Sequence, residues 1–292
     1  MKTTKNFGEK IADLFIVLFN CIIVAITLYP FIYVLSMSIS DPVSAMRQEI
    51  VLLPKGFSLD AYKLVLESSD IWNGYYNSIW YTVVGTLISV LLTITAAYPL
   101  SRKTFFARNP IMLLITFTMF FNGGLIPQYM VVNSLHLYNT RWAVILPTAV
   151  SAYNVIVART FFETLPESLH EAAKIDGAND ITILMKIITP LSKPIIAVLV
   201  LFYAVAQWNA YFPALIYVKD EARQPIQMFL YKILVQQQES LMDGMTNSYE
   251  RSLVGAQLKY AAIMVTILPI ICVYPFLQKY FVQGVMIGAV KE

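Results

Sequence analysis

The chain has 292 residues, of which 58% are hydrophobic and 13% are charged, with a formal net charge of +3. Soluble domains carry about 25% charged residues, so this chain has too few charges to cover a surface that faces water. The composition therefore excludes a soluble globular protein and a disordered one. The small net charge gives no indication of a nucleic-acid partner.

Long stretches of the chain contain no Asp, Glu, Lys or Arg: 14–40, 71–101, 109–140, 142–158, 194–218 and 260–278. An α-helix of about 20 apolar residues can cross the hydrocarbon core of a membrane. The pattern predicts an all-α membrane protein with six transmembrane helices, over about 11–36, 76–100, 110–132, 142–162, 190–217 and 258–282. We expect residues 1–292 to form a single transmembrane domain.

The distribution of basic residues predicts the orientation of these helices. Short loops on the cytoplasmic side of a membrane carry an excess of Lys and Arg. The loop 101–109 carries three basic residues, whereas the loop 133–141 carries one. We therefore expect both termini and the segment 163–189 to be cytoplasmic, and the segments 37–74 and 218–257 to be extracytoplasmic.

Several kinds of chemistry have no residues to support them. The chain has no G-x-x-x-x-G-K-[ST] sequence to cradle a nucleotide phosphate and no H-E-x-x-H metal motif. Its two histidines, His136 and His170, fall in predicted loops on opposite sides of the membrane, so we expect no metal site. None of the charge-free stretches offers an acidic residue that could relay protons. The sequence supports no enzyme, and a transporter of this kind needs an external source of energy.

The cytoplasmic segment 163–189 is predicted to begin with a short helix. Pro166 suits the first position of a helix, and Glu167 complements the dipole at its N-terminus. The helix can extend to about Asp176, where Gly177 supplies a C-cap. We therefore expect a helix of about three turns that lies across the membrane face and does not pass through the membrane.

The side chains of this helix are predicted to suit a close approach by another protein. Ala172 and Ala173 leave its surface smooth, and Glu171 and Lys174 stand three residues apart, where they can pair. A second helix is expected to follow and to reach Pro190. On physical grounds alone, an interfacial amphipathic helix that joins two spans fits this segment equally well.

The order of residues in the same segment resembles a family motif. Glu171-Ala172-Ala173, then Gly177, then Pro190 resembles the EAA motif of permeases of binding-protein-dependent ABC importers. The fuller form, with Asp176-Gly177-Ala178, resembles the MalG-like carbohydrate-importer branch. Further stretches resemble the subgroup named after LplC: Phe121–Pro127, Leu137–Thr140, Gln207–Phe212 and Gly288–Glu292. The resemblance covers a core of about 75–282.

This resemblance implies a fold, a set of partners and a location. The fold would be that of a type I ABC importer permease (MetI-like), and the chain would form a heterodimeric pore with a second permease subunit in the bacterial cell membrane. An ABC ATPase dimer would bind ATP and Mg, so this chain would hold no cofactor. An extracytoplasmic solute-binding protein, as a lipoprotein, would deliver the substrate. The residues implied to couple the chain to the ATPase are Glu167, Glu171, Ala172, Ala173, Asp176, Gly177 and Pro190.

Polar and aromatic residues within the predicted spans suggest a path for the substrate. Amide hydrogen bonds and aromatic stacking suit a sugar, and the candidate residues are Asn122, Tyr153, Asn154, Gln207, Trp208, Asn209 and Tyr211. Hydrogen bonds between helices and interfacial aromatic belts are the alternative explanation, and Asn122-Gly-Gly124 fits a helix break. The sequence predicts import of oligosaccharides or glycans. A permease for a non-sugar solute such as peptides, and a membrane scaffold that transports nothing, remain alternatives.

Overall fold

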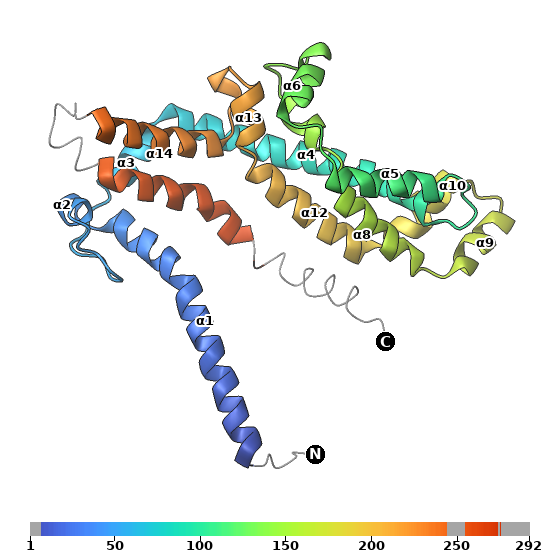
Figure 1. Ribbon diagram of the computed structural model, residues 1–292, viewed down its shortest axis with the longest axis horizontal. Helices are drawn as coiled ribbons and strands as arrows, with labels where there is room; N and C mark the ends of the chain where they lie inside the picture. Colours follow the sequence, from blue (N-terminus) through green and yellow to red (C-terminus); the bar gives the residue numbers. More distant parts are fainter. Residues whose placement is uncertain (1–6, 244–254, 274, 276–292) are drawn as a thin grey trace. The chain divides into compact units, whose positions relative to one another are not determined.

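The computed structural model describes residues 7–243, 255–273 and 275, and every regular element in those ranges is helical (Figure 1). The helices in chain order are α1 (Phe7–Ile39), α2 (Pro42–Met46), α3 (Asp60–Glu67), α4 (Ser69–Ser101), α5 (Arg108–Phe120), α6 (Leu125–Ser134), α7 (Trp142–Ile145), η1 (Leu146–Thr148), α8 (Ala152–Glu163), α9 (Glu167–Ile175), α10 (Asp180–Ile183), η2 (Leu184–Ile188), α11 (Thr189–Leu191), α12 (Lys193–Trp208), α13 (Phe212–Tyr217), η3 (Glu221–Arg223) and α14 (Ile226–Asp243), followed by an unlabelled helix, Gly255–Val273. The predicted all-α class is confirmed. The end of the sixth predicted span and the stretch 288–292 lie outside the described residues.

Three of the described helices are long and apolar enough to cross a membrane unbroken: α1, α4 and Gly255–Val273. The other apolar stretches form bent pairs. The pair α5 and α6 bends by 117°, the pair Trp142–Thr148 and α8 by 52°, and the pair Asp180–Leu191 and α12 by 86°. At least three apolar spans are therefore present. The continuous helices predicted over 110–132, 142–162 and 190–217 are wrong in detail, because each of these ranges contains a break.

The break between α5 and α6 has a local cause. Gly124 has a φ of +85°, which residues with a side chain rarely adopt. The Asn122 side-chain oxygen accepts a hydrogen bond from the Gly124 N–H at 2.8 Å and stabilises the turn. The prediction that Asn122-Gly-Gly124 breaks the helix is confirmed.

The described residues divide into two compact units, one within 1–68 and 232–268 and the other within 69–231 and 269–292. In the first unit, the end of α1 is held by polar contacts. Gln257 donates hydrogen bonds to the carbonyl oxygens of Ser38 and Ser40 at 2.8 and 2.7 Å, and the hydroxyls of Ser38 and Tyr62 lie 2.8 Å apart. In the same unit, α3 buries Ala61 and Val65 on one side. The single domain over 1–292 stays a prediction.

The second unit is built around α4, which packs against α8 and α12. Small residues are buried along α4, among them Gly74, Gly85, Ser89 and Ala97. Small residues let helix backbones approach closely where both helices lie in lipid. A polar link accompanies this packing, because the hydroxyl of Tyr203 on α12 lies 2.7 Å from that of Thr93 on α4. Apolar side chains from α4, α8, α10, η2 and α12 complete the core.

Gly74 provides a test of this close packing. A Cβ at Gly74 would lie 3.0 Å from the Cα of Ile226, a backbone atom that cannot rotate away. We expect Gly74→Ala to lower the free energy of unfolding by about 1–3 kcal/mol, because the two segments must move apart. The measurement is the thermal unfolding midpoint in detergent. Gly123→Ala is the matched control, since its Cβ would meet nothing nearer than 3.9 Å. Equal shifts in the two variants would contradict the argument.

Candidate functional site

The helix α9 is anchored through a buried histidine. His170 Nδ1 lies 3.1 Å from the hydroxyl oxygen of Tyr98, near the end of α4, and its Nε2 lies 3.8 Å from a carboxylate oxygen of Asp180. The Lys174 ammonium lies 3.7 Å from the same carboxylate. Burial, followed by the nearby cations of Arg102 and Lys174, holds the pKa of His170 below its ordinary value of 6.5, while Asp180 and Glu167 act in the opposite direction.

Ion pairs hold the start of α9 and the end of α8. Arg102 Nη2 lies 3.2 Å from an oxygen of Glu167, the first residue of α9. Glu163 forms ion pairs with two arginines, because its Oε1 lies 2.6 Å from Nη2 of Arg108 and 2.8 Å from Nη2 of Arg159. Glu167 thus has a specific partner in addition to the helix dipole, which sequence reasoning did not identify.

The end of α9 confirms the predicted glycine cap. Gly177 has a φ of +80°, and its N–H donates to the carbonyl of Lys174 at 3.0 Å. The N–H of Ala178 donates to the carbonyl of Ala173 at 3.0 Å. These two bonds form a Schellman motif, which ends a helix sharply. The predicted limits of 166–176 differ from the observed Glu167–Ile175 by one residue at each end.

The two faces of α9 differ in their surroundings. His170 and Ala173 are buried, and Ala173 packs among core residues of α10 and η2. Ser168, Glu171, Ala172 and Ile175 are exposed, and Ile175 retains 86% of its surface. Their spacing of three and four residues places them on one face of the helix. This exposed set is called the outer face of α9.

Two expectations about α9 need correction. Ala173 does not belong to the smooth exposed surface, because the core of the chain covers it and only Ala172 faces outward. Lys174 pairs with Asp180 and not with Glu171, because the turn at Gly177 returns the chain and brings Asp180 within reach. Asp176 and Pro190 are exposed.

The candidate path residues do not form one cluster in the described part of the chain. Asn122 holds the break before α6, and Asn209 donates to the carbonyl of Val205 at the end of α12. Tyr211 stacks on Tyr231 with ring centroids 5.8 Å apart. Tyr153 is exposed and its ring lies near that of Phe202, while its neighbour Asn154 is buried in α8.

Gln207 and Trp208 are buried at the end of α12 against α4. Gln207 Nε2 lies 3.5 Å from the hydroxyl of Thr148, at the limit of a hydrogen bond, and its Oε1 has no hydrogen-bond donor among the described residues. Trp208 Nε1 likewise has no acceptor there. Trp208 lines a cavity of about 190 Å³ whose walls are almost entirely apolar, including Ile79 and Leu201. Such a cavity does not suit a sugar.

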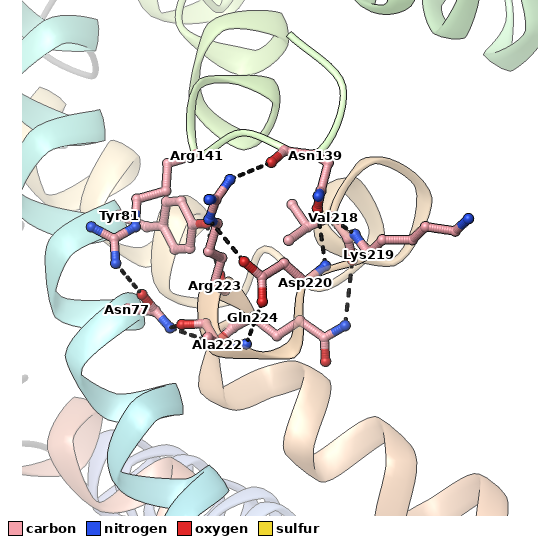
Figure 2. A network of polar contacts seen from close by, with 10 residues as sticks. All are labelled: Asn77, Tyr81, Asn139, Arg141, Val218, Lys219, Asp220, Ala222, Arg223 and Gln224. Atoms are coloured by element: carbon pink, nitrogen blue, oxygen red, sulfur yellow. Dashed lines mark hydrogen bonds and ion pairs between the residues drawn. The ribbon is translucent and has the colours of Figure 1, made fainter.

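A polar network ties the first half of α4 to the segments 139–141 and 217–226 (Figure 2). The Asn77 amide donates to the carbonyls of Ala222 and Gln224 at 2.8 and 3.2 Å, and it accepts from Arg141 at 2.8 Å. The guanidinium of Arg141 also lies 5.0 Å from the centre of the Trp80 ring, which is a cation–π contact.

Asn139 and Arg223 complete this network. Asn139 has a φ of +56°, and its side-chain oxygen accepts from the N–H groups of Lys219 and Asp220 at 3.0 and 2.9 Å. Arg223 donates to the carbonyl of Asn139 at 2.6 Å and pairs with Asp220 at 3.1 Å. Sequence reasoning missed this arrangement. The only signal was the stretch Leu137–Thr140, in which Asn139 is a residue type that tolerates positive φ.

Comparisons with known proteins decide the family. The sequence profile of the family described as the binding-protein-dependent transport system inner membrane component matches residues 71–287. The chain belongs to this family. It is therefore an ABC transporter permease, a non-enzymatic transport component with several apolar helices, and it resides in the inner membrane.

Relatives of this permease match along nearly its whole length. It is 40% identical over 288 residues to the polygalacturonan/rhamnogalacturonan transport system permease protein YtcP of Bacillus subtilis, covering 97% of this chain and 99% of that one. It is 41% identical to the protein LplC of the same organism, covering 100% and 98%. The crystal structure of a bacterial ABC transporter that imports the acidic polysaccharide alginate contains a chain of the same fold. The TM-score is 0.84 at 33% identity, over 96% of this permease and 100% of that chain. The predicted membership and MetI-like fold are confirmed.

The network around Asn77 predicts a loss of stability on truncation. Asn77→Ala would leave the Arg141 guanidinium and two carbonyl oxygens without this partner. We expect the free energy of unfolding to fall by roughly 2–4 kcal/mol. The thermal unfolding midpoint of the purified permease is the measurement. Asn73→Ala, at an exposed position one turn earlier on α4, is the control and should change little. An unchanged midpoint in Asn77→Ala would show that the network contributes no stability.

The environment of His170 predicts a pH dependence. Because the pKa of His170 is lowered in the folded chain, the unfolded chain binds a proton more readily on acidification, and stability falls as the pH drops below about 6.5. We expect the thermal midpoint to fall between neutral pH and about pH 5. His170→Gln, which retains a hydrogen-bonding side chain toward Tyr98 but does not titrate, should show a smaller fall. An identical pH profile in the two proteins would refute this assignment.

Proposed function

We propose that the chain is the transmembrane permease subunit of an ATP-driven ABC importer for oligosaccharides or glycans. The transport functions of its relatives support a sugar substrate: polygalacturonan and rhamnogalacturonan for one, alginate for the crystallised importer, and arabinooligosaccharides for a third at 28% identity. A relative at 30% identity takes up osmoprotective compounds, which keeps a non-sugar solute as the second candidate. Peptide import and a scaffold that transports nothing have no such support.

The proposed topology has six spans and both termini in the cytoplasm. Three spans are unbroken helices, and each bent pair would supply one more. Backbone that departs from a helix is tolerated at membrane depth only where protein or a water-filled cavity covers it. The break near Asn122 would therefore face the interior of the assembled transporter, and the three basic residues of 101–109 would face the cytoplasm.

The proposed coupling surface is the outer face of α9, and this exposed face carries the proposal. Glu171 and Ala172 would contact the ATPase directly, because they are exposed while the opposite face is packed into the chain. Glu167, Ala173 and Gly177 would act as positioning residues through the Arg102 pair, the core packing and the helix cap. Asp176 and Pro190, both exposed, would lie at the edge of the contact.

The proposed partners follow from this arrangement. A second permease would complete the pore, and an ABC ATPase dimer would bind ATP and Mg, so that this chain holds no cofactor. The family description names a binding-protein-dependent system, and we propose an extracytoplasmic solute-binding lipoprotein as the donor of substrate. Closure of the ATPase dimer would move α9, and the ties from α9 to α4 would transmit the movement into the membrane.

Some of the candidate residues, but not all, would line a path for the substrate. Gln207 is the best-placed candidate, because it is buried beside α4 with an oxygen that has no donor in the described part of the chain. Tyr153, Asn154 and Asn209 would lie along the same route. Trp208 fits the apolar packing of α12 better than a sugar contact, and Asn122 and Tyr211 are occupied with local contacts.

The test is a reversal of charge on the outer face of α9. Glu171→Lys should reduce substrate-stimulated ATP hydrolysis of the reconstituted importer by at least about tenfold, since a misplaced charge in an interface costs more than the 1.4 kcal/mol that corresponds to tenfold. Membrane insertion should be unchanged. Glu67→Lys makes the same charge change at an exposed position on α3 and should retain activity. Full activity in Glu171→Lys would remove the proposed coupling role.

A further inference from the structure

A polar cavity lies beside α9, at the end of α4. It has a volume of about 410 Å³ and is lined by Ser101, Arg102, Lys103, Arg108, Glu163 and Glu167, with apolar side chains behind them. A water molecule takes up about 30 Å³ in the liquid, so the cavity has room for a small polar group such as a phosphate. The proposed coupling uses the Arg102–Glu167 pair in the wall of this cavity, but not the space that the cavity encloses.

The cavity carries more positive than negative charge. Its two carboxylates, Glu163 and Glu167, face four basic side chains, because Arg159 also reaches Glu163 from within α8. Lys103 is exposed and forms no ion pair with any described residue. The surplus positive charge favours an anion.

The arginines also retain unused hydrogen-bond donors. A guanidinium has five N–H groups, and the Nε–H groups of Arg102 and Arg108 are buried without an acceptor among the described residues. Buried donors of this kind are rare in folded proteins. A phosphate oxygen would satisfy them after a modest rotation of the side chains, and arginine suits phosphate in geometry as well as in charge.

The surroundings of the cavity point to lipid as the source of the phosphate. Ser101 ends the apolar helix α4 and Arg108 begins α5. In the proposed topology, the turn between them lies where two apolar helices leave the hydrocarbon region on the cytoplasmic side. Phe106, within this turn, retains 94% of its surface, and Leu113 on α5 is also exposed. Exposed aromatic residues beside basic ones are typical of a membrane interface.

We propose that this cavity binds the phosphate group of an anionic phospholipid, with Arg102, Lys103 and Arg108 as its contacts and Phe106 inserted among the acyl chains next to it. Basic pockets between transmembrane helices are suited to such headgroups. The bound phosphate would share Arg102 with Glu167, so the lipid would lie directly against the start of α9. This site does not depend on the coupling function of α9.

The experiment counts lipids retained by the full-length chain, with any subunits that copurify, by native mass spectrometry from mixed phosphatidylglycerol and phosphatidylcholine nanodiscs. The test variant is K103Q/R108Q, in which Arg159 still neutralises Glu163. The control is K186Q/K193Q, which removes the same charge from two exposed positions outside the cavity. A second arm adds inorganic phosphate to nanodiscs of phosphatidylcholine alone.

We expect retained phosphatidylglycerol to fall by about fivefold for each basic side chain removed in K103Q/R108Q and to stay unchanged in K186Q/K193Q. Equal retention in the two variants would overturn the proposal. Specific binding of inorganic phosphate without a preference for phosphatidylglycerol would overturn lipid as the source. The readout is lipid and not transport, so loss of ATPase coupling in Glu171→Lys and loss of lipid in K103Q/R108Q are separate results.

Discussion

The burial of α4 between α8 and α12 is the constraint on which the second unit depends. In lipid, helices gain little from the hydrophobic effect against one another, so close packing and hydrogen bonds must hold them together. The small buried residues of α4 and the bond between Thr93 and Tyr203 meet this need. Without these contacts, packing of α4 against α8 and α12 would be little more favourable than its contact with lipid.

The same helix carries polar contacts in its first half and near its C-terminal end. Tyr81, in the first half of α4, donates to the carbonyl of Arg223, and Tyr98, near the end of the helix, bonds to His170. Seventeen residues separate the two tyrosines along a continuous helix, which corresponds to about 25 Å. A movement of α9 therefore acts on the end of a helix whose first half is bonded to the segment 217–226. This geometry suits the transmission of force across a membrane.

The outer face of α9 can meet another protein because the inner face is held so firmly. Ala173 and His170 are buried, and the Schellman cap at Gly177 returns the chain so that Asp180 reaches Lys174. Since these contacts fix the helix against its own chain, the exposed Glu171 and Ile175 form a surface with a defined position. A helix attached only by its connections to the spans would move without moving α4.

The sequence by itself determined the membrane character, the helix α9 with its glycine cap, the break at Asn122 and the family resemblance. These depend on local composition, on short-range backbone preferences and on the order of residues in one segment. Only the tertiary structure decided that Ala173 faces inward, that Lys174 pairs with Asp180 and that the chain bends by 86° before α12. It also decided the bond from Asn77 to Ala222, 145 residues away. Such contacts depend on which distant segments pack together, and no periodicity within one segment carries that information.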